Sequence, residues 1–182
     1  TTDGTTPYEA SGKSYRYTGT FTVKAGGVFS AIAVADGYSD SAVATVTKYG
    51  KGDRATVDKI KYKVTNASEK TVTVTGTSIQ SGTVTIPAKV TINGITYKVN
   101  AVSAKAFKGK TKITKVVIGK NVKKIGKNAF YGCKKLKTIE IKGAKKLSTI
   151  GENAFKNISS SATIAVKTSK AKLVKKVKKL VK

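Results

Sequence analysis

The stretch KKIGKNAFYGCKKLKTIEIKGAK, residues 123–145, is one of three similar segments in the second half of the chain. The others are AVSAKAFKGKTKITKVVIGKNV at 101–122 and LSTIGENAFKNISSSATIAVKTSK at 147–170. Their apolar positions recur in register, at the spacing of Phe107, Phe130 and Phe155. A unit this short cannot bury its own apolar face, so we expect the units to stack on one another as a solenoid.

The repeated positions define a predicted core and two predicted walls. Within each unit, V-x-I or I-x-I predicts a short strand with alternating faces. The sequence Asn-Ala-Phe at 128–130 and 153–155 predicts a tight helical turn on the opposite wall. Gly126 and Gly151 are expected to adopt turn conformations that other residues avoid. The predicted core ladder consists of Phe107, Phe130, Phe155, Ile125, Ile150, Ile139, Ile141 and Cys133.

The middle unit resembles the BspA-like, or Treponema-type, leucine-rich repeat, whose pattern runs I-G-x-x-A-F-x-x-C-x-x-L-x-x-I-x-I-P. The residues that match it in order are Ile125, Gly126, Ala129, Phe130, Cys133, Leu136, Ile139 and Ile141. The first unit departs from the pattern at Ser103 and Lys110, and the last departs at Ile158 and Ser161. The resemblance covers about 83–168 and implies the repeat fold in a secreted or surface-exposed bacterial protein.

We place the repeats at 101–168. The segments before and after them have sequence patterns that differ from the repeat. Residues 49–100 combine a Tyr-Gly-Lys-Gly linker with strand-like runs, which predict an antiparallel cap over the open end of the solenoid. Asn93-Gly94 between two of these runs is typical of a type I′ hairpin. Residues 1–48 alternate strand-like runs with Gly and Asp turns, as in a β-sandwich. Residues 169–182 place Leu and Val at helical spacing opposite Lys, which predicts a cationic amphipathic helix.

The segment 1–48 also resembles the immunoglobulin-like C-terminal module found beside chitobiase and hexosaminidase catalytic domains. The runs TTDGTTP at the start and AIAVADGYSDSAVATVT at 31–47 carry this resemblance. The module's opening strands are missing, so we expect either that the unit is truncated or that another segment fills its missing edge. The predicted fold class is therefore mainly β. It comprises a partial immunoglobulin-like β-sandwich unit, an antiparallel strand cap, a short leucine-rich repeat solenoid with brief helical turns, and a C-terminal helix.

The composition excludes several kinds of catalytic site. The chain has no His, which removes the imidazole base, the Ser-His-Asp triad and imidazole metal ligands. Cys133 is the single Cys, which excludes an intrachain disulfide and a Cys-cluster zinc site. Asp3, Glu9, Asp36 and Asp40 match no calcium-loop spacing, so we assign them to turns and solubility. We predict a non-catalytic protein with no metal, no cofactor and no small-molecule substrate.

The formal charge of +27 is concentrated in the second half, where residues 101–182 carry 24 Lys and 2 Glu. Lys is a hydrated point charge without the planar fork of Arg, so this charge favours attraction to polyanions over the reading of bases. The alternative interpretation is a solvated surface that only confers solubility. Alternating strand positions predict that Lys115 and Lys137 form a ladder, with Lys134 and Lys135 beside it, as the binding face.

Four smaller features admit two interpretations each. The C-terminal helix could lie on an anionic membrane, but it lacks Trp and Phe, and we favour a solenoid cap. The phenylalanines could stack against sugars or bases, but their interval favours a buried ladder. Cys133 could be a reactive thiol beside lysines, but the repeat places it inward. Packing or carbohydrate stacking is open for Tyr8, Tyr15, Tyr17 and Tyr38.

These features predict a non-catalytic extracellular binding or adhesion module of a bacterial surface or secreted protein. Its expected partner is a host protein, a glycan or an anionic cell-wall polymer, and the adhesion function rests on the family resemblance. One alternative is an accessory region of a larger carbohydrate-active enzyme, and another is a polyanion-binding protein for nucleic acid or sulfated glycan. The scarcity of Arg counts against nucleic acid, and no apolar run is long enough to span a membrane. The chain starts without Met, so we expect a piece of a longer protein.

Overall fold

The structure is a computed structural model, and it describes residues 28–31, 44–47, 49–143, 147–166 and 175. The predicted mainly β class is confirmed, because every element assigned within these residues is a strand. The predicted C-terminal helix over 169–182 lies outside the described residues, apart from one position. The predicted immunoglobulin-like unit is described only at strands β1 (Val28–Ala31) and β2 (Ala44–Thr47), which pair antiparallel.

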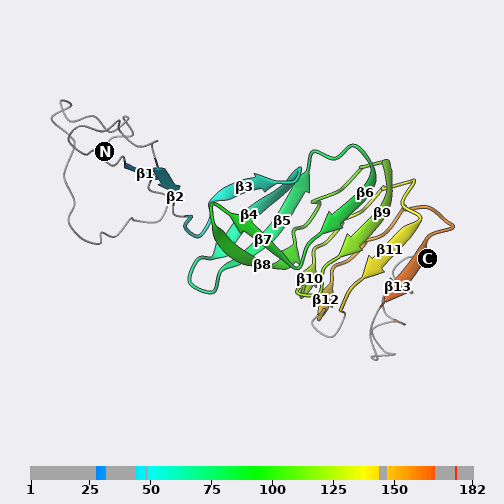
Figure 1. Ribbon diagram of the computed structural model, residues 1–182. Coiled ribbons are helices and arrows are strands. Elements are labelled where there is room, and N and C mark those ends of the chain that lie inside the picture. The colour runs from blue at the N-terminus through cyan, green and yellow to red at the C-terminus, as the bar shows by residue number, and fades with distance from the viewer. Residues whose placement is uncertain (1–27, 32–43, 48, 144–146, 167–174, 176–182) are drawn as a thin grey trace, which may run out of the picture. The chain divides into compact units, whose positions relative to one another are not determined.

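The chain forms two compact units, Thr1–Asp53 and Arg54–Lys182. The second unit is a β-solenoid of about four turns, and Figure 1 shows its strands side by side in stacked coils. Its strands are β3 (Arg54–Val57), β4 (Ile60–Asn66), β5 (Thr71–Thr77), β6 (Ser81–Ile86), β7 (Lys89–Ile92), β8 (Ile95–Val102), β9 (Lys112–Ile118), β10 (Lys124–Ile125), β11 (Thr138–Ile141), β12 (Thr149–Ile150) and β13 (Thr163–Val166).

Each coil of the solenoid has three walls. Strands β6, β9, β11 and β13 form a four-stranded parallel sheet, which we call the front sheet (Figure 1). Strands β5, β8, β10 and β12 pair in parallel on a second wall. The third wall, which we call the turn wall, is built from turns that link the second wall to the front sheet. Stacking whole coils therefore buries one continuous core along the solenoid.

The cap differs from the sequence prediction in part. Strands β3, β4 and β5 are antiparallel neighbours, and β7 and β8 form the predicted hairpin. Asn93 and Gly94 have φ angles of 44° and 73°, as a type I′ turn requires, so that prediction is confirmed. However, β5 and β6 also pair in parallel with β8 and β9, so they form a first coil of the solenoid. Alternating apolar residues specify a half-buried strand but not the direction of its partner.

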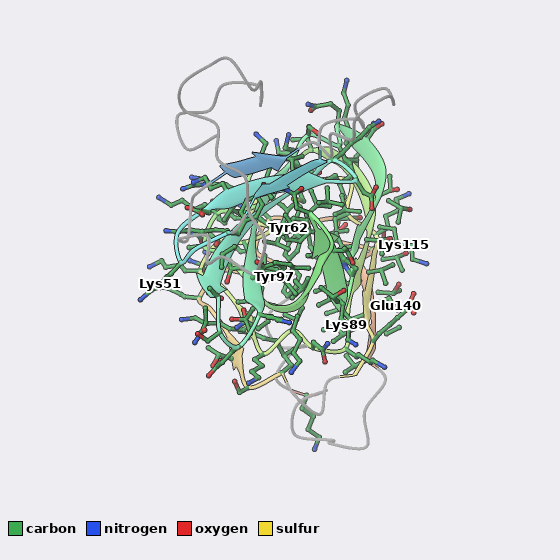
Figure 2. All side chains as sticks on the ribbon, turned by 60° about the vertical axis from the view of Figure 1, so that its left-hand side comes forward. Lys51, Tyr62, Lys89, Tyr97, Lys115 and Glu140 are labelled. Atoms are coloured by element: carbon green, nitrogen blue, oxygen red, sulfur yellow. The ribbon has the colours of Figure 1, made fainter. Side chains whose placement is uncertain are left out.

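Stacked aromatic rings run through the centre of the solenoid. The ring centroids of Phe107 and Phe130 lie 4.9 Å apart, and those of Phe130 and Phe155 lie 5.2 Å apart. Both pairs are nearly parallel, with interplanar angles of 3° and 1°. In the cap, Tyr62 and Tyr97 point into the interior (Figure 2). The repeat isoleucines are buried with these rings, namely Ile125, Ile150, Ile139 and Ile141.

The turn wall is not the helical turn that the sequence predicted. Along residues 128–133, alternate backbone N–H groups bond within the coil and to the next coil. Phe130 N donates to Ala154 O of the next coil at 2.8 Å, and Tyr131 N donates to Asn128 O of its own coil at 3.2 Å. Asn128 starts the turn with a φ of 57°, which Asn tolerates better than most residues. The next coil satisfies every second donor, so a helical hydrogen-bond pattern is not needed.

The repeat glycines have a different role from the one predicted. Neither Gly126 nor Gly151 has a positive φ. Instead, a Cβ atom at Gly126 would collide with the backbone of Ser103 and Ala104 in the preceding coil. A Cβ atom at Gly151 would collide in the same way with the backbone at Gly126 and Lys127. The repeat therefore keeps glycine here because consecutive coils touch through their backbones.

Candidate functional site

The part of the front sheet that begins at Lys115 and its partners is neutral on its outward side and rich in hydroxyl groups. Its register places Lys115 opposite Thr83 and Thr138, and Val117 opposite Thr85 and Glu140. We call this surface the neutral face, and its residues are Thr83, Thr85, Lys115, Val117, Thr138, Glu140, Thr163 and Ala165. One lysine and one glutamate in eight positions leave it without net charge.

The predicted ladder of Lys115 and Lys137 is not formed. Neighbours in this part of the sheet are one full repeat apart, so Thr138 and not Lys137 lies beside Lys115. Lys137 precedes β11, and its N–H donates to Thr114 O of the previous coil at 2.9 Å. An offset of a single position places the two lysines in different columns of the stack.

The charge of Lys115 is neutralised on the neutral face. Its Nζ lies 3.5 Å from Glu140 Oε2, and Lys142 Nζ lies 3.9 Å from Glu140 Oε1. Figure 2 shows Lys115 and Glu140 projecting outward from the same side of the sheet. Both partners are partly exposed, so the pairs contribute little to stability. Their effect is to remove Lys115 from the set of free cations.

Lysines gather instead where the turn wall meets the front sheet. We call this surface the lysine rim, and its members are Lys110, Lys112, Lys134, Lys135 and Lys137. Four of them are exposed, whereas Lys110 is half-buried and its Nζ contacts Gln80 Oε1 at 3.5 Å. None of the five forms an ion pair with another described residue. The rim thus contains three of the four lysines that the sequence analysis singled out.

The two coils that carry the rim are joined by backbone hydrogen bonds. Lys135 N donates to Thr111 O at 3.2 Å, and Lys137 N donates to Thr114 O at 2.9 Å. Lys112 is a rim residue that the sequence prediction does not include, although it is the repeat equivalent of Lys135. The step from Lys112 to Lys135 equals the step from Phe107 to Phe130, and this match is the signal that could have identified it.

No carboxylate lies within the rim. Residues 70–139 contain neither Asp nor Glu. The two glutamates of the repeats are on either side of the rim, with Glu140 on the neutral face and Glu152 on the turn wall. Lys127 Nζ lies 2.6 Å from Glu152 Oε2, and this hydrogen bond and the charge of Lys127 lower the pKa of Glu152. Both glutamates therefore form ion pairs with lysines outside the rim, and the positive charge of the rim is not neutralised by them.

Cys133 lies directly before the rim but points into the core. It is fully buried, and its thiol donates to Phe107 O at 3.1 Å. Burial raises the pKa of Cys133 to about 11, although the Lys110 backbone and charge act in the opposite direction. A thiol that stays protonated is a poor nucleophile. The structure thus favours the packing role of Cys133 over the reactive one.

A hollow of about 260 Å³ lies at the other end of the front sheet. Pro87, Ala88 and Val117 line it, and Lys120 and Lys142 flank it. Its lining is mostly apolar, in contrast to the rim.

No cluster of His, Cys, Asp or Glu suited to a metal ion occurs among the described residues. In the same part of the chain, no helix has the length and hydrophobicity needed to cross a bilayer. The acidic residues and tyrosines considered in the segment 1–48 lie outside the described residues. They are Asp3, Glu9, Asp36, Asp40, Tyr8, Tyr15, Tyr17 and Tyr38.

Several solved structures are similar to this chain. A leucine rich cell surface protein from Faecalibacterium prausnitzii matches with 30% identity and a TM-score of 0.54, over 63% of this chain and 31% of that protein. A leucine-rich repeat protein from Bacteroides ovatus matches with 27% identity and a TM-score of 0.48, over 62% and 37%. One from Bacteroides capillosus matches with 22% identity and a TM-score of 0.51, over 63% and 99%. The chain therefore spans about a third of the length of the first two proteins.

Family models match both ends of the chain, and no curated protein matches it. Residues 1–45 match the chitobiase/beta-hexosaminidase C-terminal domain. Residues 100–177 match the BspA type leucine rich repeat region, in six copies. The stacked coils and the phenylalanine column lie within this second match and agree with it, so this part of the chain is similar to a BspA type leucine rich repeat region.

Proposed function

We propose that the chain is a non-catalytic binding module of a bacterial surface or secreted protein, and that it contacts its partner through the lysine rim. The observation that carries this proposal is the gathering of five lysines at one edge of the stack, none of them ion-paired with another described residue. Solubility alone needs charge on the surface but does not need it gathered without carboxylates. Host protein, glycan and anionic cell-wall polymer are the candidate partners.

The relatives support an extracellular location and a binding role. The Faecalibacterium protein is described as a cell surface protein, and it shares the repeat fold at 30% identity. Repeat solenoids offer extended surfaces that suit the binding of long partners. The absence of His from the chain also limits acid–base chemistry near neutral pH.

A binding panel tests the proposal. The chain is titrated against heparin, a wall polymer, a host matrix protein and DNA at low and at physiological salt. The test variant is K112Q/K134Q/K135Q, and the control K61Q/K89Q/K98Q removes the same number of exposed charges from the cap. We expect the affinity of the rim variant to fall at least tenfold and the affinity of the cap variant to change little, because the ligand contacts the rim and not the cap. Equal losses in the two variants would show that only net charge matters, and the rim would then be excluded.

A second candidate function is an accessory region of a larger carbohydrate-active enzyme. The match of residues 1–45 to the chitobiase/beta-hexosaminidase C-terminal domain favours it. The sequence of the whole protein tests this candidate directly. A glycosidase domain ahead of residue 1 would support it, whereas additional repeats or a wall anchor would support the surface module.

A further inference from the structure

We infer that the ligand of the lysine rim is a linear sugar or polyol polymer that carries sulfate or phosphate groups and lies along the solenoid axis. This inference rests on the proposed use of the rim and adds the class of ligand. It follows from the shape of the rim, from the groups between its lysines, and from the absence of other anchors there.

The rim has the shape of a stripe that crosses the coils. Lys112 begins β9, and its partner in the first coil is Ser81 of β6. Lys135 stacks on the segment that contains Lys112, as the bond from Lys135 N to Thr111 O shows. Neighbouring parallel strands are about 4.8 Å apart, so cations on consecutive coils form a row with close spacing. A linear polyanion can contact such a row at several points at once.

The stripe continues beyond the lysines as neutral polar surface. In the first coil it begins at Gln80 and Ser81, which precede and start β6. In the last coil, Ser159 and Ser161 follow the turn wall, and their hydroxyl groups lie 2.9 Å apart. Two charged coils are thus flanked by two polar coils, none of them carrying a carboxylate at this edge. A polymer longer than the row of lysines would still contact polar side chains at both ends.

The exposed side chains beside the rim lysines carry hydroxyl groups. Thr111 and Thr114 are exposed beside Lys112, and Ser81 is exposed next to it. Hydroxyl groups both donate and accept, so they suit the hydroxyl and ether oxygens of a sugar or polyol chain. Lysine ammonium groups attract sulfate or phosphate as point charges, without requiring a fixed orientation.

Two other polyanionic partners lack the contacts that they need. Single-stranded nucleic acid is held by aromatic rings on which its bases stack. The rim contains neither aromatic residues nor Arg. An anionic membrane is entered by apolar side chains, but Ile113 and Leu136, which lie between the rim lysines, are completely buried. The rim therefore offers charge and hydroxyl groups alone.

The test uses probes of graded length. Heparin oligosaccharides and glycerol phosphate oligomers of increasing length are titrated into the full chain, with a single-stranded DNA of equal charge and an acidic protein in parallel. We expect affinity to rise with length and then level off once the probe spans the rim. The negative slope of log affinity against log salt is expected to become less steep by about 2 in K112Q/K134Q/K135Q, since each contact with a single-stranded polyanion contributes roughly 0.7. The cap variant K61Q/K89Q/K98Q keeps the original slope.

The outcomes separate this inference from the proposed function. A preference for the heparin or the glycerol phosphate series identifies sulfate or phosphate as the anionic group. Stronger binding of DNA, or of the acidic protein, with loss in the rim variant would overturn the polymer class and leave the rim as a binding surface. Affinities that are equal in the rim variant and the unaltered chain for all four probes would overturn both proposals.

Discussion

The rings of Phe130 and Phe155 lie 5.2 Å apart and within 1° of parallel, on consecutive coils of the solenoid. Phe130 has Phe107 on its other side at 4.9 Å, so its ring is enclosed by two others. The Phe130→Ala substitution would empty the middle of this column. We expect it to lower the free energy of unfolding by about 3–5 kcal/mol, the usual cost of removing a core aromatic side chain.

Denaturant unfolding followed by circular dichroism measures this loss. Tyr131→Ala, at the adjacent and partly exposed position, is the matched control and should cost much less. A midpoint for Phe130→Ala close to that of the control would mean that the ring column does not hold the coils together.

Gly126 tests whether the coils touch through their backbones. In Gly126→Ala the new methyl group must displace the backbone at Ser103 and Ala104, and we expect a destabilisation of about 1–3 kcal/mol. Gly76→Ala is the control, because its methyl group would lie 3.5 Å from its nearest neighbour, an ordinary contact. Thermal melting of the two variants compares them, and equal shifts would contradict the close approach at Gly126.

The left-handed turn at Asn128 can be tested by a pair of substitutions. Asn128 has a φ of 57°, which alanine adopts only with strain and glycine adopts freely. Asn128→Ala should therefore cost about 1 kcal/mol or slightly more, and Asn128→Gly should cost less. Chemical denaturation ranks the two variants. If alanine proved the more stable, the backbone conformation of the turn wall would not be the one described.

Alkaline pH should unfold the chain through two buried groups. Burial raises the pKa of Cys133 from 9.0 to about 11, and burial followed by the charge of Asp58 raises that of Tyr62 from 10.0 to about 12. A raised pKa means that the folded state favours the protonated group. The stabilisation is therefore complete below the unfolded pKa and is lost as pH rises to the folded value.

The free energy of unfolding should accordingly fall between about pH 9 and about pH 11 as Cys133 ionises. It should fall between about pH 10 and about pH 12 as Tyr62 ionises. Cys133→Ala removes the first component, so its stability should stay level up to the range of Tyr62. A curve for Cys133→Ala that is parallel to that of the unaltered chain would show that the thiol does not titrate as described.

The repeat interval was sufficient to predict the solenoid, because Phe107 and Phe130 can stack only if their coils are in register. The same interval also decides which lysines lie side by side. The step from Lys112 to Lys135 equals the repeat interval, whereas the step from Lys115 to Lys137 is one position shorter, and only the first pair shares a column. A ladder on one face requires the full repeat distance, since a shift by a single position changes the direction of a side chain.

Other features depended on contacts between segments that the sequence does not display. Asn93-Gly94 specified its hairpin locally, and its prediction is confirmed. By contrast, the parallel pairing of β5 and β6 is determined by β8 and β9, which follow them in the chain. The role of Gly126 was also hidden, because glycine is used both for unusual backbone angles and for close approach.

The backbone hydrogen bonds that join one coil to the next on the turn wall all run in the same direction. Phe107 N donates to Ala129 O of the following coil, and Phe130 N donates to Ala154 O of the coil after that. A stack with one sense of direction can be lengthened or shortened by duplication or deletion of whole units, since each new junction repeats an existing one. Adding a copy of the middle unit would also add Lys134, Lys135 and Lys137 to the same edge. For the polymer ligand proposed above, duplication of a unit would raise avidity without redesign of the interior.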